Sequence, residues 1–211
     1  MRRADESGLT LPELLVVMLV FGLVAALATQ ATVMLAGSVR STQGTANATA
    51  QVRFALSSIE RQVRSGDVLF SPAGEAGIGS CQAYGTTAGS CMRVYTHANG
   101  SGVCVQWQVI PDPGDPSSAV MRTRTFSPAW QTDGTIKAWQ VVARGLQLPS
   151  ATAPPFTLQG GSTPFASRLL DVTVTAPDTG QNGRLVSLTS SIAGRNTTYG
   201  YDTSLCFPAP A

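Results

Sequence analysis

Few side chains in this 211-residue sequence are suited to chemistry, and their spacing assembles no catalytic set. His97 is the only histidine, and the sequence contains no G-x-S-x-G, H-E-x-x-H or phosphate-binding glycine loop. Asp112 and Asp115 lie between prolines, where a solvated turn is a better interpretation than a calcium site. We therefore predict no enzyme, no catalytic residue, no cofactor and no metal ligand. A secreted hydrolase has no motif in its favour.

Four cysteines, Cys81, Cys91, Cys104 and Cys206, all follow a long hydrophobic segment near the N-terminus. An even number of cysteines in an exported domain predicts two disulfides. Of the three possible pairings we favour Cys81 with Cys91, across a glycine-rich loop, and Cys104 with Cys206, which would tie the C-terminal tail to a hairpin. A zinc site made of all four cysteines is the alternative, although no CxxC pair supports it.

The hydrophobic segment has the length and composition of a membrane helix. No ionisable residue occurs from Leu14 to Val39, and Leu14 to Ala28 is apolar throughout except for a glycine. As a helix, this uncharged run would extend about 39 Å, which exceeds a hydrocarbon core of roughly 30 Å. Arg2 and Arg3 precede it, so the arginine bias predicts a cytoplasmic N-terminus and an exported remainder.

One acid, Glu13, borders the uncharged run. A carboxylate at mid-bilayer costs roughly 3 kcal/mol, so Glu13 must find a partner or stay at the interface. In a capping box, Thr10 would be the N-cap, Pro12 would lie in the first turn, and Glu13 would reach back to the N-cap amide. In an apolar helix bundle, an amine on an adjacent subunit would be its natural partner. The two roles can hold in succession.

Three interpretations of the N-terminus compete. A secretory signal peptide would be cut at Ala26-Leu27-Ala28, and an uncleaved signal anchor would keep the whole segment. The third, which we favour, rests on the sequence Gly8-Leu9-Thr10-Leu11-Pro12-Glu13-Leu14-Leu15. This stretch resembles the cleavage and methylation motif of type IV prepilins and type II secretion pseudopilins.

The resemblance implies a defined processing reaction. Prepilin peptidase would cut between Gly8 and Leu9 and N-methylate Leu9, and Glu13 would then compensate the new amine of a neighbouring subunit. The sequence departs from the common pattern at Leu9, where Phe or Met is more frequent, and at Pro12, where an aliphatic residue is usual. Both residues that define the motif, Gly8 and Glu13, are retained.

Beyond the uncharged run, the pattern predicts a continued helix and then a sheet. Residues 29–51 contain no proline and can continue the helix weakly, and apolar residues from Val52 to Val63 at spacings of 4, 3 and 4 form one helical stripe that should end near residue 65. Short alternating runs follow, which are typical of antiparallel strands. We expect strands at 92–97, 103–110, 120–126, 137–143, 168–175 and 185–192, a loop at 111–116, and a long excursion at 145–164.

We thus expect an α+β, pilin-like fold with one long N-terminal helix, transmembrane in its first half, packed on an antiparallel β-sheet head. The divisions are a cytoplasmic leader (1–8), the helix (9–66, transmembrane at about 12–36) and an exported head (67–211). The helix end Phe54 to Arg64 also looks like that of minor pilins and J-type pseudopilins.

The resemblance implies a minor pilin or pseudopilin subunit that joins a pilus or pseudopilus after membrane insertion. Its partners would be prepilin peptidase, other pilins, the inner-membrane assembly platform and, before assembly, lipid. The alternative is a membrane-anchored adhesin or binding domain that never polymerises. Only 12% of residues are charged, against roughly 25% in soluble domains, which disfavours an ordinary cytosolic enzyme. A net charge of +2 without a basic block gives direct nucleic-acid binding no electrostatic support.

Overall fold

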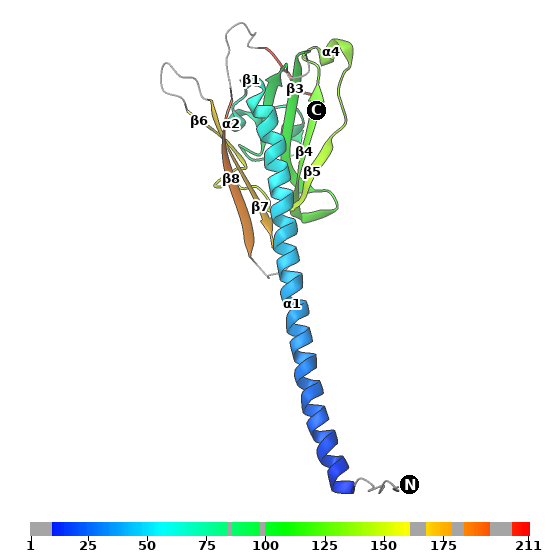
Figure 1. Ribbon diagram of the computed structural model, residues 1–211. Helices are drawn as coiled ribbons and strands as arrows, with labels where there is room; N and C mark the ends of the chain where they lie inside the picture. Colours follow the sequence, from blue (N-terminus) through cyan, green and yellow to red (C-terminus); the bar gives the residue numbers. More distant parts are fainter. Residues whose placement is uncertain (1–9, 84–85, 98–99, 161–167, 179–183, 195–203) are drawn as a thin grey trace, which may run out of the picture.

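The computed structural model describes residues 10–83, 86–97, 100–160, 168–178, 184–194 and 204–211. One long helix, α1 (Leu11–Arg64), packs through its C-terminal half against a head of two antiparallel sheets (Figure 1). Its N-terminal half projects away from the head. This arrangement is the α+β, pilin-like fold predicted from the sequence.

The two sheets contain every strand of the described residues. The first sheet has the order β1-β2-β3-β4-β5, and the second has the order β6-β7-β8. The strands are β1 (Gly66–Leu69), β2 (Cys91–Thr96), β3 (Val103–Asp112), β4 (Asp115–Phe126), β5 (Gln140–Leu146), β6 (Phe156–Gln159), β7 (Leu169–Pro177) and β8 (Leu185–Ala193). Three short helices, α2 (Pro72–Glu75), α3 (Gly79–Ala83) and α4 (Trp130–Asp133), lie in the connections.

Helix α1 begins where its sequence predicts. Thr10 is the N-cap, and Pro12 and Glu13 lie in the first turn. The Thr10 side chain makes no cap hydrogen bond, so the expected capping box is not formed. The polar stretch 29–51 continues the helix without a break, and α1 ends at Arg64, as predicted.

Gly66, the first residue of β1, is not a left-handed helix cap. The C-cap is Ser65, which keeps a right-handed conformation. A Cβ atom on Gly66 would lie 2.5 Å from the Val94 side chain, because β1 leaves the helix directly against β2. Gly66 is therefore needed for close backbone approach.

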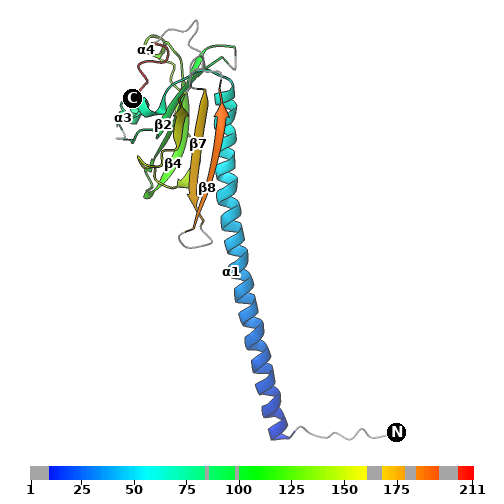
Figure 2. The ribbon, with the colours of Figure 1, turned by 90° about the vertical axis from the view of Figure 1, so that its left-hand side faces the viewer.

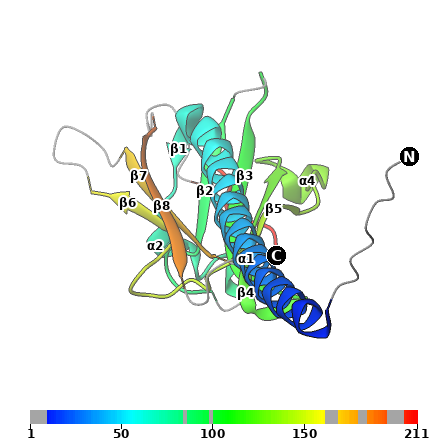
Figure 3. The same cartoon turned by 60° about the horizontal axis from the view of Figure 1, so that its bottom comes forward.

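The apolar stripe of α1 forms the centre of the core. Figures 2 and 3 show the helix lying along the junction of the two sheets. Its buried side packs against the inner faces of both sheets, where Trp107, Phe156 and Val172 are almost fully inaccessible. The buried helix residues are Gly44, Ala48, Val52, Ala55, Ile59 and Val63. The main core is therefore shared with α1, whereas a second, smaller hydrophobic cluster, which includes Tyr95, Phe126 and Cys206, contains no residue of α1.

The predicted hairpin around residues 98–102 is confirmed, because β2 and β3 pair in register from Cys91 with Gln108 to Thr96 with Val103. The predicted loop at 111–116 is wrong in extent. Strand β3 continues to Asp112, and β4 already begins at Asp115, so the turn is reduced to Pro113 and Gly114. Asp112 accepts a hydrogen bond from the Gly114 amide (2.9 Å), which closes this short turn.

Two strands were not predicted. Strand β1 follows the helix immediately, and β6 lies inside the expected excursion 145–164. Both have only four residues, which is too short for periodicity to be visible. Phe156 fixes β6 instead, since its side chain is buried and its amide donates to Gly89 O (3.0 Å).

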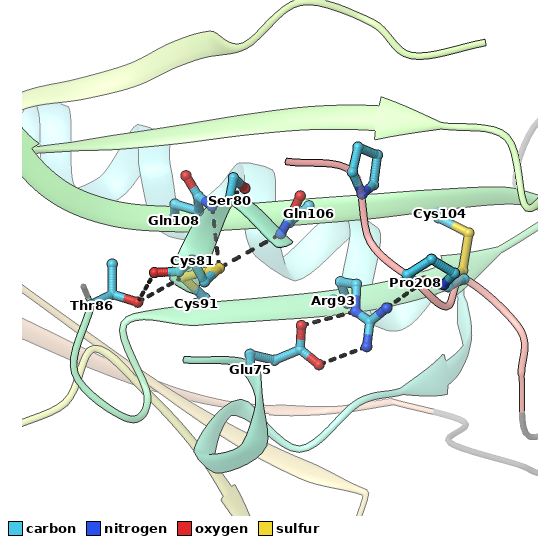
Figure 4. Close-up of polar contacts among 12 residues, drawn as sticks. Glu75, Ser80, Cys81, Thr86, Cys91, Arg93, Cys104, Gln106, Gln108 and Pro208 are labelled. Carbon is cyan, nitrogen blue, oxygen red and sulfur yellow. Dashed lines mark hydrogen bonds and ion pairs between the residues drawn. A yellow bond between two sulfur atoms is a disulfide. The ribbon is translucent and has the colours of Figure 1, made fainter. Parts of the chain in front are cut away.

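The outer face of the first sheet carries a buried polar layer (Figure 4). Gln108 Oε1 accepts from Arg122 Nε (3.0 Å) and Nη2 (2.8 Å), and Gln106 Oε1 accepts from Arg124 Nε (3.0 Å). Burial, with the nearby Arg122 charge, lowers the pKa of Arg124 to about 10, so its guanidinium stays protonated at neutral pH. Helix α3 covers this layer through Ser80, which accepts from Gln108 Nε2 (2.5 Å).

The C-terminal tail (204–211) is fixed to the same face. Arg124 donates to Pro210 O (2.6 Å), and Trp130 Nε1 donates to Pro208 O (2.8 Å). Arg93 donates to Cys206 O and makes a two-point ion pair with Glu75, at 2.8 and 2.9 Å. The tail is thus part of the folded head.

A first prediction tests the role of the helix in the core. Ile59→Ala should lower the free energy of unfolding by about 3 kcal/mol, because it leaves a cavity between α1 and the sheets. The matched control, Arg53→Ala on the exposed side of α1, should cost about 0.5 kcal/mol or less. Denaturant unfolding of the full chain in detergent micelles measures both. Equal losses in the two variants would contradict the packing described.

A second prediction concerns the buried pair. Arg93→Met should cost about 3–5 kcal/mol at pH 7, because Glu75 stays buried without its cation, and the double variant Arg93→Met/Glu75→Met should recover most of this loss. Burial raises the pKa of Glu75 above its ordinary 4.5 even beside Arg93. Because the pKa of Glu75 is higher in the folded chain than in the unfolded chain, its contribution to the free energy of unfolding is greatest at pH values below the unfolded pKa. This contribution declines as the pH rises.

The loss in the single variant should therefore shrink as the pH falls toward 4.5, measured by denaturant unfolding at several pH values. A single variant that matches the double variant at pH 7 would show that the buried charge is not the cause.

Candidate functional site

The most unusual surface of the molecule is the projecting half of α1. Its large apolar side chains from Leu11 to Val39 are 47–76% exposed, on every side of the helix. Burying one such side chain is worth about 1.5–3 kcal/mol, so this segment cannot remain in water. The helix is long and apolar enough to cross a membrane, and no other part of the described chain covers its most apolar stretch. We call Leu11–Val39 the apolar rod.

The residues predicted for processing lie at the end of this rod. Gly8 and Leu9 fall outside the described residues. Glu13 lies in the first turn of α1 and is exposed, and its carboxylate makes no hydrogen bond or ion pair with any part of the chain that the structure describes. Its carboxylate is therefore positioned at the rod's edge and is available to a group from outside.

The four cysteines form two disulfides, Cys81 with Cys91 and Cys104 with Cys206. This is the pairing favoured from the sequence. The first bond joins α3 to the start of β2, and the second joins β3 to the C-terminal tail (Figure 4). No thiolate is left in the described cysteines for the alternative zinc site.

His97 has two partners that spacing did not identify. Its Nδ1 lies 2.9 Å from Asp67 Oδ2, and its Nε2 lies 3.0 Å from the Tyr95 hydroxyl. The arrangement resembles part of a catalytic triad, but a phenol stands where a Ser or Cys nucleophile would be needed. The backbone of Gly102 also lies against the Tyr95 hydroxyl, where it leaves no room for a substrate. The two contacts of His97 suit a structural role, in which they link β1 to the end of β2.

The carboxylates of Asp112 and Asp115 both accept hydrogen bonds from groups within the head. Arg144 Nη1 donates to Asp112 Oδ2 (3.0 Å), and Ser117 donates its amide and hydroxyl to Asp115 Oδ1 (3.1 and 2.6 Å). The bonds from Ser117 lower the pKa of Asp115. Among the described residues, no group of three or more His, Cys, Asp and Glu side chains could hold a metal ion.

The three tryptophans have structural positions. Trp107 is buried in the core and donates to Gln62 Oε1 (2.6 Å). Trp139 stacks under the guanidinium groups of Arg122 and Arg124, each 4.3 Å from the ring centroid. These contacts, with the Trp130 bond to the C-terminal tail, give the three side chains structural roles.

The sequence interpretation did not identify the polar layer on the outer sheet face. Alternation of Arg and Gln with apolar residues in β3 and β4 was a usable signal for a shared face. That pattern normally indicates a solvated face. What the pattern could not reveal is that α3 and the C-terminal tail cover it.

Comparison with known proteins bears on the N-terminus. The family model described as "Prokaryotic N-terminal methylation motif" matches residues 3–29. No curated protein and no solved structure shows significant similarity to the chain. The matched segment includes Gly8, Leu9, Glu13 and the first half of the apolar rod.

The match and the fold agree. A motif of this kind marks the N-terminus of prepilins, and an apolar helix projecting from a β-rich head is what such a motif is expected to precede. Residues 3–29 therefore match a prokaryotic N-terminal methylation motif, in the segment where the sequence predicted a prepilin-type motif, and this segment leads into the projecting half of α1.

Proposed function

We propose that this chain is a minor pilin or pseudopilin subunit that is cut after Gly8, methylated on Leu9 and packed by its apolar rod into a pilus or pseudopilus. The observation that carries the proposal is the coincidence of a methylation motif at 3–29 with a rod that the head leaves uncovered. In this proposal the protein is a substrate of prepilin peptidase and a structural subunit, with no catalytic activity of its own.

Before assembly, the rod would span the inner membrane. Residues 1–8 would be the cytoplasmic leader, the helix would cover 9–66 with about 12–36 in the bilayer, and the head (67–211) would be exported. Two disulfides support export, because such bonds persist in oxidising compartments.

During assembly, neighbouring helices would replace lipid around the rod. Both environments are apolar, so the exchange costs little for the leucine, valine and phenylalanine side chains. Glu13 is the exception, because its carboxylate would enter the bundle with the rod. The amine of a cleaved neighbour, exposed at Leu9, is the partner that would neutralise it, which explains why an acid can be kept beside an otherwise uncharged run.

The head would supply specificity for other pilins and for the assembly platform. It is well suited to that task because its fold is held in place. The buried side of α1, the two disulfides and the hydrogen-bonded C-terminal tail (204–211) all stabilise the head. Whether the filament serves a pilus, DNA uptake or secretion depends on partners outside this chain.

A third prediction tests the Glu13 pairing. Glu13→Ala should leave leader cleavage unchanged, because the cut lies five residues away, and should abolish incorporation into filaments. Cleavage is followed by the mass of the membrane-bound chain, and incorporation by the fraction that pellets with sheared filaments. The control is Glu60→Ala, an acid at the other end of α1 that forms a surface pair with Arg64; it should incorporate normally.

Normal incorporation of Glu13→Ala would refute the pairing. A cleaved, stable chain that never enters filaments, even with Glu13 intact, would favour the membrane-anchored adhesin alternative.

A further inference from the structure

The underside of the head contains an open groove beside α1. It has a volume of about 680 Å³ and a mixed lining, in which Gly44, Leu148 and Leu185 lie together with polar residues such as Gln51, Asp115 and Arg144. Gly44 is the first buried residue of α1, so the groove lies where the apolar rod leaves the head. We call it the base groove, and Figure 3 views the molecule from this underside.

Strand directions confirm which end of the head this is. Strand β8 starts at Leu185 in the groove and runs toward Gly194, where a Cβ atom would lie 3.1 Å from Val63 O near the end of α1. Strand β4 starts at Asp115, which also lines the groove, and ends at Phe126 beside Ile136. Ile136 therefore marks the opposite end of the head.

We propose that, before assembly, the base groove is seated on the membrane and takes phospholipid from the interfacial layer of the outer leaflet. The proposal rests on membrane insertion of the apolar rod as put forward above. It adds a second membrane contact, made by the head, that the methylation motif does not imply.

The length of the helix brings the groove to the lipid. Gly44 follows Val39, the last residue of the uncharged run, by five positions, which is about 7.5 Å along a helix. The headgroup layer on each side of a bilayer is about 5–7.5 Å deep. The segment proposed to lie in the bilayer ends at about residue 36, so Gly44 lies about 12 Å beyond it on an upright helix, and a tilt of the helix lowers the groove toward the headgroup layer.

The excess length of the uncharged run strengthens the contact. A run of about 39 Å in a core of roughly 30 Å is accommodated by tilting, and tilt is set by side chains at the interface. Leu148 and Leu185 are such side chains, since they are 40% and 49% exposed on the underside although they belong to the head. A tilt toward the groove buries both in the interfacial layer.

The charges that line the groove balance. Only Arg144 and Asp115 among its lining residues are charged. Arg144 is already paired with Asp112, and Asp178 accepts from Thr45 (2.6 Å). The underside is therefore close to neutral, and the contact should depend little on anionic lipid.

The test uses the full chain, one per nanodisc of phosphatidylethanolamine and phosphatidylglycerol. The described cysteines are all disulfide-bonded, so an introduced thiol can be labelled with a fluorophore. Leu148→Cys and Leu185→Cys are compared with Ile136→Cys and Phe207→Cys, which match them at 39% and 57% exposure. Leu23→Cys reports insertion of the rod. Lipids with a nitroxide near the headgroup quench labels at the interface, lipids with a nitroxide near the end of the acyl chain quench a label at 23 in an inserted rod, and iodide reports access from water.

Nitroxide lipid should reduce emission about twofold at 148 and 185 and leave 136 and 207 nearly unchanged, because interfacial groups lie within 5–10 Å of the headgroup boundary. The same quenching should persist without phosphatidylglycerol. Quenching at 23 alone would overturn the head contact and leave the proposed function standing. No quenching at 23 would overturn both.

Two other results would also overturn the lipid seat. Labels at 148 and 185 shielded from nitroxide lipid and from iodide would indicate that protein, and not lipid, fills the groove. Quenching that disappears without phosphatidylglycerol would indicate an electrostatic contact instead of an apolar one.

Discussion

Everything in this structure depends on the need to keep a 26-residue uncharged helical run out of water. Its large apolar side chains are exposed around the whole helix, and the head covers none of them. In the proposed function, lipid would satisfy this requirement in a monomer, and neighbouring helices would satisfy it in a filament. Because both surroundings are apolar, the chain could pass from one to the other, and Glu13 would be the group whose burial then requires a specific partner.

The same helix also determines where the head lies. The uncharged run ends at Val39, and from Gly44 onward α1 has one buried stripe, which completes a core shared by the two sheets. Head and rod are therefore joined by one continuous helix, with no linker between them. This continuity fixes the distance from the last uncharged residue to the underside of the head, which is what would bring the base groove to the membrane surface.

The sequence predicted features whose signal is local. The helix end at Arg64, the β2–β3 hairpin and the later strands follow from period and turn residues, and each is confirmed with shifts of a few residues. The sequence did not predict the features that depend on tertiary contacts. Strands β1 and β6 are four residues long, Gly66 acts through close approach to Val94, and the Arg93–Glu75 pair and the tail clamp join segments far apart in the chain. His97 and Asp67 are likewise brought together only by strand pairing.

The central claim is that the rod is released from its leader at one glycine, which frees an amine that can meet Glu13 of a neighbour. Intact-mass and N-terminal peptide mass spectrometry of the protein purified from its own host tests this most directly. The account predicts a chain that begins at N-methylated Leu9. A chain that still begins at Met1, or one that begins near Thr29, would contradict it.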